Sequence, residues 1–189
     1  MKKLIAFLTI LFVSVLCTAC INNLAVQELN NKAKEYLEAG DVQSAICRLK
    51  SSIDLDATIY ETHYNLTIAY VKNREFKNAK EEIEIAMQLK PESPDNYYTL
   101  GIINEGLADE VLAVDEDENA APTAATAVAE PDKKQIELAI SYLNEAVNAY
   151  EKYLSKAPTA SDKEQVAHQI ESLKRRISEL NGETQGEAQ

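Results

Sequence analysis

The sequence repeats itself with a period of 34 residues, and this period constrains the fold more than any other feature of the chain. Such a period is typical of one supersecondary unit that stacks on copies of itself. The first segment begins at Val26. It has Ala33 at its eighth place, Tyr36 at the eleventh, Gly40 at the fifteenth, Val42 at the seventeenth, Ala45 at the twentieth and Leu49 at the twenty-fourth. The second segment begins at Tyr60. It has Leu66 at its seventh place, Tyr70 at the eleventh, Phe76 at the seventeenth, Ala79 at the twentieth, Ile83 at the twenty-fourth, Ala86 at the twenty-seventh and Pro91 at the thirty-second. Two segments in register predict two copies of one helical hairpin.

The residue types at these places describe the packing of paired helices. Small residues such as Ala45 and Ala79 let two helices cross closely, larger residues fill the gaps beside them, and a proline such as Pro91 follows the end of the second helix. Residues and spacing together resemble the tetratricopeptide repeat. The resemblance implies an all-α fold, a right-handed superhelical stack of about three helical hairpins that ends in a C-terminal capping helix. The pattern is one of packing and carries no catalytic group.

A third copy begins at Pro94 and departs from the pattern after its first helix. Tyr97, Leu100 and Gly101 take the fourth, seventh and eighth places, but Asn104 stands at the eleventh, where the first two copies have tyrosine. Residues 109–132 then contain eight acidic residues, no basic or aromatic residue, and many alanines. We therefore predict that residues 26–108 hold repeats one and two with the first helix of repeat three, and that residues 109–132 form a disordered acidic insert.

Helical periodicity resumes at Lys133 and predicts a long helix over residues 133–158 that completes the third hairpin. Two registers fit it: one puts Ala139 and Ala146 at the twentieth and twenty-seventh places, and the other puts Ala146 at the twentieth and Pro158 at the thirty-second. Beyond this helix, Ser161 and Glu164 have the spacing of a capping box. We predict a capping helix over residues 161–180 and a flexible tail over residues 181–189.

The first residues have the order of a secretory signal peptide. Lys2 and Lys3 precede an apolar run of thirteen residues, which is too short to span a bilayer, and small residues follow up to Cys20. We expect residues 1–19 to be a signal peptide. Ordinary cleavage after Ala19 would leave Cys20 as a free amino-terminal cysteine.

Thr18, Ala19 and Cys20 also resemble the bacterial lipobox, although Cys17 stands where that motif has leucine. This resemblance implies that Cys20 carries the lipid and that residues 20–25 form a lipidated terminus and short tether. Ile21 follows the cysteine where an aspartate would indicate retention in the inner membrane. The expected location is therefore exported and lipid-anchored, on the periplasmic side of the outer membrane.

Charge and motif content argue against several classes of function. The chain has 19 basic and 31 acidic residues, and removal of residues 1–19, with Lys2 and Lys3, takes the net charge from −12 to −14. Such a chain repels nucleic acid. No phosphate-binding glycine loop is found, and Glu164 with His168 lacks further metal ligands. Cys47 reads as a packed helical residue. We expect no enzyme activity, cofactor, metal or small-molecule substrate.

In the tetratricopeptide family the first helix of each hairpin lines the groove that binds ligands, so the fifth, ninth and twelfth places identify a candidate site. Asn30 and Glu105 also stand at these places. The site itself is predicted to comprise Lys34, Leu37, Tyr64, Ile68, Val71, Tyr98 and Ile102. This row is partly aromatic and apolar, and it lacks the repeated Lys and Asn with which chaperone-binding relatives hold a terminal carboxylate. An extended or helical apolar segment of another protein is the expected ligand, with Tyr64 and Tyr98 as anchors.

These features together predict a membrane-anchored scaffold or assembly factor of the bacterial cell envelope, which binds another protein. A structural envelope or surface lipoprotein without a specific peptide ligand is the alternative. A periplasmic hydrolase is the third possibility, and no constellation of residues favours it.

Overall fold

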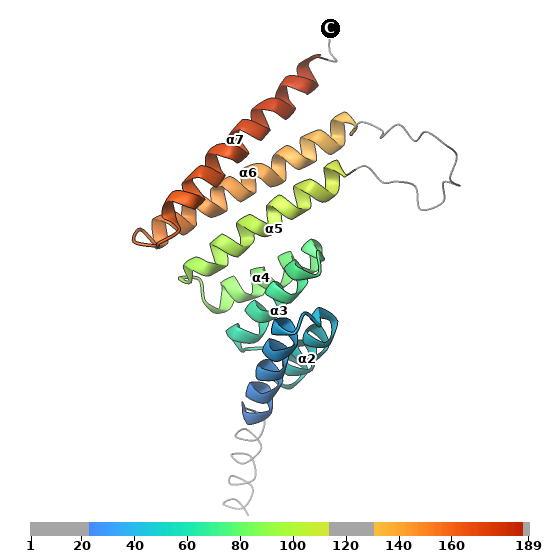
Figure 1. The fold of residues 1–189 in the computed structure, drawn as a ribbon, viewed down its shortest axis with the longest axis vertical. Coiled ribbons are helices and arrows are strands. Elements are labelled where there is room, and N and C mark those ends of the chain that lie inside the picture. The colour runs from blue at the N-terminus through green and yellow to red at the C-terminus, as the bar shows by residue number, and fades with distance from the viewer. Residues whose placement is uncertain (1–22, 114–130, 187–189) are drawn as a thin grey trace, which may run out of the picture. The chain divides into compact units, whose positions relative to one another are not determined.

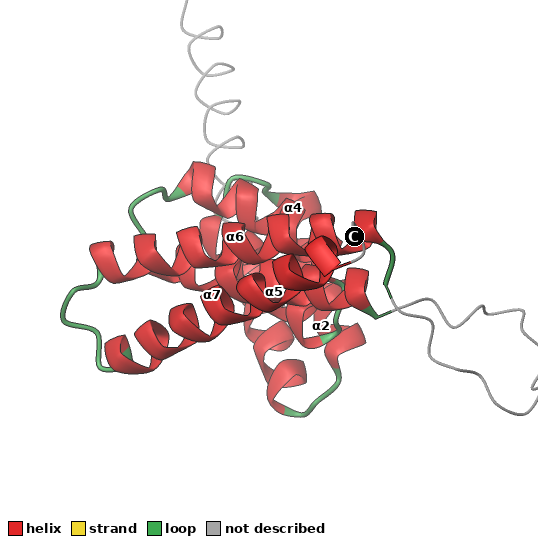
Figure 2. Cartoon of the chain, turned by 90° about the horizontal axis from the view of Figure 1, so that it is seen from above, coloured by secondary structure: helices red, strands yellow, loops and turns green. Residues whose placement is uncertain are grey.

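A computed structural model describes residues 23–113 and 131–186, and every regular element in these two ranges is a helix (Figure 2). The helices span residues 23–38, α2 (Val42–Leu55), α3 (Tyr60–Lys72), α4 (Phe76–Leu89), α5 (Pro94–Leu112), α6 (Lys133–Lys156) and α7 (Lys163–Gly186). The chain divides into two compact units, Met1–Asn73 and Arg74–Gln189. The predicted all-α arrangement of helical hairpins is confirmed. The predicted signal peptide and Cys20 lie outside the described residues.

The first unit contains the hairpin of residues 23–38 and α2, with α3 packed on α2. Gly40 lies in the turn with a φ of +81°, a backbone conformation that side chains with a Cβ rarely adopt. Asp41 then caps α2, because its carboxylate accepts the backbone N–H of Ser44 at 3.1 Å. The helix before this turn already includes residues 23–25, so the predicted tether of residues 20–25 is corrected at its end. Gln27 donates to Asn23 at 3.1 Å, one helical turn earlier.

A polar network joins the three helices of the first unit. The amide nitrogen of Asn30 donates to the hydroxyl oxygens of Ser52 and Thr62, at 2.9 Å each. Its amide oxygen accepts from Asn65 at 3.1 Å. Ser52 and Thr62 are fully buried, so these hydrogen bonds satisfy groups that water cannot reach. Asn30, at the fifth place of its repeat, therefore forms hydrogen bonds that hold the helices of this unit together.

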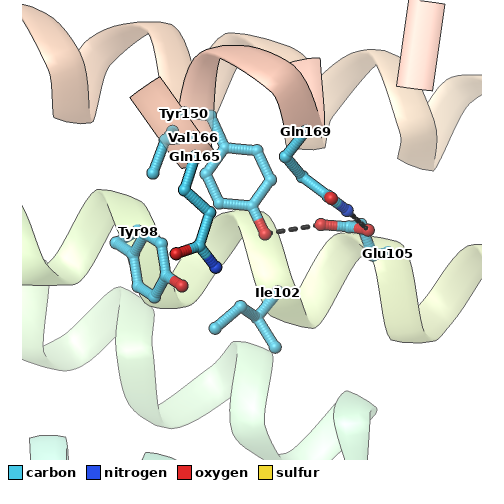
Figure 3. A pocket seen from close by; sticks show the side chains of 7 residues that line it. All are labelled: Tyr98, Ile102, Glu105, Tyr150, Gln165, Val166 and Gln169. Carbon is cyan, nitrogen blue, oxygen red and sulfur yellow. Dashed lines mark hydrogen bonds between the residues drawn. The ribbon is translucent and has the colours of Figure 1, made fainter. Parts of the chain in front are cut away.

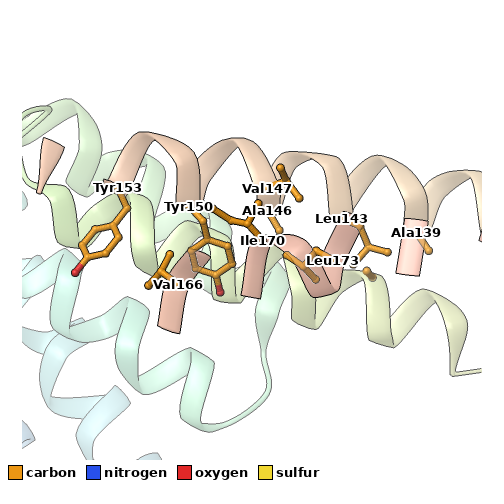
Figure 4. Packing of buried hydrophobic residues seen from close by; sticks show 10 residues of the cluster. Ala139, Leu143, Ala146, Val147, Tyr150, Tyr153, Val166, Ile170 and Leu173 are labelled. Carbon is orange, nitrogen blue, oxygen red and sulfur yellow. The ribbon is translucent and has the colours of Figure 1, made fainter. Parts of the chain in front are cut away.

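The second unit is a layer of antiparallel helices in which α5, α6 and α7 lie side by side (Figure 1). The apolar stripe of α6 packs in one buried cluster with apolar residues of α7 (Figure 4) and with Ala108 of α5. The cluster consists of Ala108, Ala139, Leu143, Ala146, Val147, Tyr150, Tyr153, Val166, Ile170 and Leu173. Burial of this stripe, and not intrinsic helix propensity, is the main stabilisation of such long helices.

Two glycines let α5 approach a helix on each side. A Cβ placed on Gly101 would lie 2.5 Å from a ring carbon of Tyr150 in α6. A Cβ on Gly106 would overlap the ring of Phe76 in α4. The aromatic rings thus occupy the space that side chains on α5 would otherwise fill.

The structure selects between the two registers of the third hairpin. In the first hairpin the fifth-place Asn30 bonds to the twenty-seventh-place Ser52. In the third hairpin the fifth-place Tyr98 packs on Tyr153, with ring centroids 5.3 Å apart. Tyr153 is the twenty-seventh residue only when Pro158 is the thirty-second. The register that ends with Pro158 is therefore the one adopted.

In this register both helices of the third hairpin are longer than those of a regular repeat. The α5 helix continues to Leu112, and α6 begins at Lys133, ten residues before its seventeenth place at Leu143. Buried Leu107, Ala108 and Ala139 pack in the added turns. The predicted insert of residues 109–132 is corrected at its start, because α5 extends into it, and Asp132 forms the capping box of α6 with Gln135. Residues 114–130 lie outside the described residues.

The last helix differs from its prediction at both ends. The α7 helix begins at Lys163, and the carbonyl of Asp162 accepts the backbone N–H of Val166 at 2.9 Å. The N-cap is therefore Asp162 and not Ser161. At the other end α7 continues to Gly186, so residues 181–186 of the predicted flexible tail are helical. The stripe that buries Leu173 ends at partly buried Leu180, and the helical backbone continues beyond it.

The close approach at Gly101 leads to the first prediction. We expect Gly101→Ala to lower the free energy of unfolding by about 1–3 kcal/mol, because its methyl group would overlap the buried ring of Tyr150. Gly182→Ala is the matched control, since Gly182 is helical with open space around it and alanine there should be neutral or stabilising by up to about 1 kcal/mol. Urea unfolding followed by circular dichroism measures both. Equal stability of the two variants would contradict the packing described here.

Candidate functional site

A pocket lies in the second unit where α5, α6 and α7 meet (Figure 3). Tyr98, Ile102 and Glu105 lie four and three residues apart on α5, so they share one face of that helix. The lining is completed by one residue of α6 and three of α7: Tyr150, Gln165, Val166 and Gln169. The cavity has a volume of about 310 Å³.

The wall of the pocket is aromatic and held in place by packing. The ring of Tyr98 meets that of Tyr150 edge-on, with centroids 5.7 Å apart and planes 61° apart. It also packs on Tyr153 at 5.3 Å. Such tilted and edge-to-face arrangements are favourable between aromatic rings. Tyr98 is therefore fixed on one side while it remains half-exposed on the other.

Glu105 supplies the charge of the pocket. One carboxylate oxygen accepts the hydroxyl of Tyr150 at 2.5 Å, and the other accepts the side-chain N–H of Gln169 at 2.5 Å (Figure 3). Burial raises the pKa of Tyr150, and its hydrogen bond to Glu105 raises that pKa further. Tyr150 therefore stays a neutral donor at neutral pH.

A second tyrosine–carboxylate bond closes the neighbouring turn. The hydroxyl of Tyr153 donates to Asp162 at 2.7 Å. This hydrogen bond, together with burial, raises the pKa of Tyr153 to about 12. Because Asp162 is the N-cap of α7, the bond joins the end of α6 to the start of α7 and sets where α7 begins over the pocket.

Comparison with solved structures identifies the fold. The first TPR domain of Spaghetti (RPAP3), bound to the HSP90 peptide SRMEEVD, gives a TM-score of 0.59 at 17% identity, over 82% of this chain and 94% of that one. The second TPR domain of human RPAP3, in complex with the HSP70 peptide SGPTIEEVD, gives 0.58 at 15% identity, over 79% and 98%. The Sgt2 TPR domain from Aspergillus fumigatus gives 0.58 at 18% identity, over 82% and 81%. The chain has the tetratricopeptide-repeat fold. No family model and no curated protein matches its sequence.

In this tetratricopeptide-repeat fold the residues predicted to bind a ligand fall into two groups. Tyr98 and Ile102 come together in the pocket, beside Glu105 at the twelfth place of the same repeat. The other five belong to the first unit and do not line this pocket: Lys34, Leu37, Tyr64, Ile68 and Val71. Tyr64 stacks on Tyr60 of its own helix at 5.7 Å. The groove as a whole stays a prediction.

Four lining residues were not identified from the repeat pattern. Tyr150 and Val166 stand at apolar positions of α6 and α7 with helical spacing, and this spacing predicts burial and not a pocket. Gln165 and Gln169 flank Val166 four residues apart, and both are exposed. A long polar pair beside the stripe of a capping helix was the only signal available. This signal did not indicate that α7 contacts α5. Periodicity shows which face of a helix is buried, and it does not show which other helix covers that face.

Across residues 23–113 and 131–186, no group of three or more His, Cys, Asp or Glu side chains is placed to hold a metal ion. His63 is buried and its ring nitrogen lies 2.9 Å from the carbonyl oxygen of Ala57, a structural contact. Cys47, predicted to be packed, is instead exposed on α2. None of the described helices combines the length and apolar composition needed to cross a bilayer.

The two raised tyrosine pKa values lead to a pH prediction. In an unfolded chain the pKa of tyrosine is about 10. In the folded protein the pKa of Tyr153 is raised to about 12. The folded state therefore holds more protons, so this stabilisation is complete below about pH 10 and is lost as the pH rises toward 12. We expect the urea midpoint to fall over this range, and to fall less in Tyr153→Phe and Tyr150→Phe. Parallel curves for the wild type and both variants would refute this.

Proposed function

We propose that this chain is a lipid-anchored scaffold or assembly factor of the bacterial cell envelope that binds a segment of another protein. The observation that carries the proposal is the pocket of the second unit, where the fifth, ninth and twelfth places of the third repeat face α7 around a cavity. These are the places from which a ligand-binding row was predicted. A half-exposed aromatic residue beside apolar and polar side chains is typical of sites that anchor a partner.

The fold supports the same proposal in a general way. The two RPAP3 domains similar to this chain were solved with peptides of HSP90 and HSP70 bound. A stack of helical hairpins offers extended surface and few groups suited to chemistry. The ligand we propose is an extended or helical segment of a partner protein, and the pocket receives one of its side chains.

Tyr98 is a poor first choice for mutation, although it is the predicted anchor. Its ring packs on Tyr150 and Tyr153, so Tyr98→Ala would disturb the joint between α5 and α6 as well as binding. Gln165 is exposed and lines the pocket without a packing role. It is therefore the better position at which to place a probe.

We expect a photo-crosslinking amino acid such as benzoylphenylalanine at position 165 to join the chain to one defined protein when intact cells are irradiated. The physical reason is that a bound segment would pass within a few ångströms of this side chain. The matched control is the same probe at Glu171, which is exposed on α7 and does not line the pocket. Mass spectrometry identifies the adduct. No adduct at 165, or the same adduct at both positions, would rule out this pocket as the partner site.

The membrane anchor is tested separately at Cys20. We expect the wild type to incorporate a labelled fatty acid and to fractionate with the outer membrane, because several acyl chains hold a protein at a bilayer. In Cys20→Ala the label should be absent and the chain should appear in the soluble periplasmic fraction. A wild type without label, or a variant that stays on the membrane, would show that the anchor is wrong without affecting the binding proposal.

A further inference from the structure

The carboxylate of Glu105 is half-buried at the pocket and has no basic partner among the described residues. Three other carboxylates on the same helices form ion pairs: Asp109 with Arg176 at 2.7 Å, Glu145 with Lys80 at 2.7 Å, and Glu151 with Lys174 at 3.2 Å. Glu105 has two neutral donors, Tyr150 and Gln169, and none of the Lys or Arg side chains in the described ranges forms an ion pair with it. Among the described residues that line the cavity, Glu105 alone is charged. A half-buried negative charge thus faces a cavity, and no side chain of the described residues acts as its counter-ion.

The geometry of Glu105 leaves room for one more pair of hydrogen bonds. A carboxylate has about four acceptor positions, two on each oxygen. Tyr150 uses one on the first oxygen, and Gln169 uses one on the second. Each oxygen therefore keeps a free acceptor position, which suits a planar donor with two parallel N–H groups. These two donors also hold the carboxylate in place before any ligand arrives, which reduces the entropy lost on binding.

The walls suit the remainder of such a ligand. The half-exposed ring of Tyr98 offers an aromatic surface on which a delocalised cation stacks favourably. Ile102 and Val166 supply apolar contact for an aliphatic stem. A carboxylate at one end, an aromatic ring at the side and apolar contacts along the stem together describe the complement of an arginine side chain.

We propose that the pocket of α5, α6 and α7 is an arginine-recognition site, in which Glu105 receives the guanidinium group of a partner segment and Tyr98 stacks on it. The inference rests on the proposed function for the source of the arginine, a partner protein. Charge complementarity supports it, because a chain with a net charge of −12 attracts a basic segment and repels an acidic one. Lysine would supply the charge and not the two-pronged geometry.

Small probes test the pocket without knowledge of the partner. The full chain, labelled with 3-fluorotyrosine in detergent micelles, is titrated with the N-acetyl methylamides of arginine, lysine, norleucine and glutamate and followed by fluorine NMR. All nine tyrosines lie within the described residues, and Tyr→Phe variants assign the signals of Tyr98 and Tyr150. We expect arginine to shift these two signals with about tenfold higher affinity than norleucine, with lysine between them and glutamate without effect. Equal affinity for arginine and norleucine, or no shift with arginine, would overturn the proposal.

A charge-neutral variant tests the role assigned to Glu105. Glu105→Gln keeps an acceptor for Tyr150 and removes the charge, so the preference for arginine over norleucine should disappear. Glu110→Gln is the matched control, because it removes the same charge from an exposed position on the same helix and should leave the preference intact. Loss of the preference in both variants would show a long-range charge effect and not a site. If Glu105→Gln does not fold, the wild-type series with the four probes still decides.

The two proposals fail in different ways. A crosslinked partner combined with no preference for arginine would sink the arginine site and leave the scaffold function standing. A preference for arginine combined with no crosslinked partner would keep the specificity of the pocket and sink the proposed function. The salt dependence of arginine binding distinguishes a specific site from general electrostatic attraction. An ion pair in a half-buried pocket is screened less by salt than contacts on the open surface.

Discussion

The second unit depends on how closely α5 approaches the helices on both sides of it. Gly101 admits the ring of Tyr150 from α6, and Gly106 admits the ring of Phe76 from α4. Because these glycines lie five residues apart, they point to different faces of the helix and serve different neighbours. An added methyl group at either place would push a helix away, and with it the side chains that line the pocket. The pocket is thus a consequence of backbone proximity, which only residues without a Cβ permit.

This close packing has a polar exception that explains why the third repeat departs from the pattern. Asn104 is fully buried at the place where the other repeats have tyrosine, and its amide oxygen accepts from Lys80 at 3.1 Å. Lys80 also pairs with Glu145 at 2.7 Å, so one cation joins α4, α5 and α6. The amide nitrogen of Asn104 has no hydrogen-bond partner among the described residues, which carries a penalty of about 1–3 kcal/mol. The network thus lowers the stability of the folded state and specifies how the three helices are arranged.

The α7 helix has a larger role than closing the stack. Its apolar stripe buries Val166, Ile170 and Leu173 against α6. Its polar side reaches α5, through Gln169 to Glu105 and through Arg176 to Asp109 at 2.7 Å. A terminal helix that only shielded the core would need the first set of contacts and not the second. The polar contacts give the pocket its third wall and orient its carboxylate.

The sequence by itself determined the helical hairpins and the apolar faces of α6 and α7, and it placed Tyr98 and Ile102 on the one face of α5 that lines the pocket. Each of these depends on periodicity, and periodicity records which face of a helix is buried. The sequence did not determine the ends of α5 and α7. The end of α5 depends on a neighbouring helix, because Val111 and Leu112 pack against the cluster of α6 and α7. Nor did the sequence reveal that Tyr150 and Gln169 bond to Glu105, 45 and 64 residues away in the chain. Contacts between side chains on different helices depend on the crossing of those helices, and only the tertiary structure decides it.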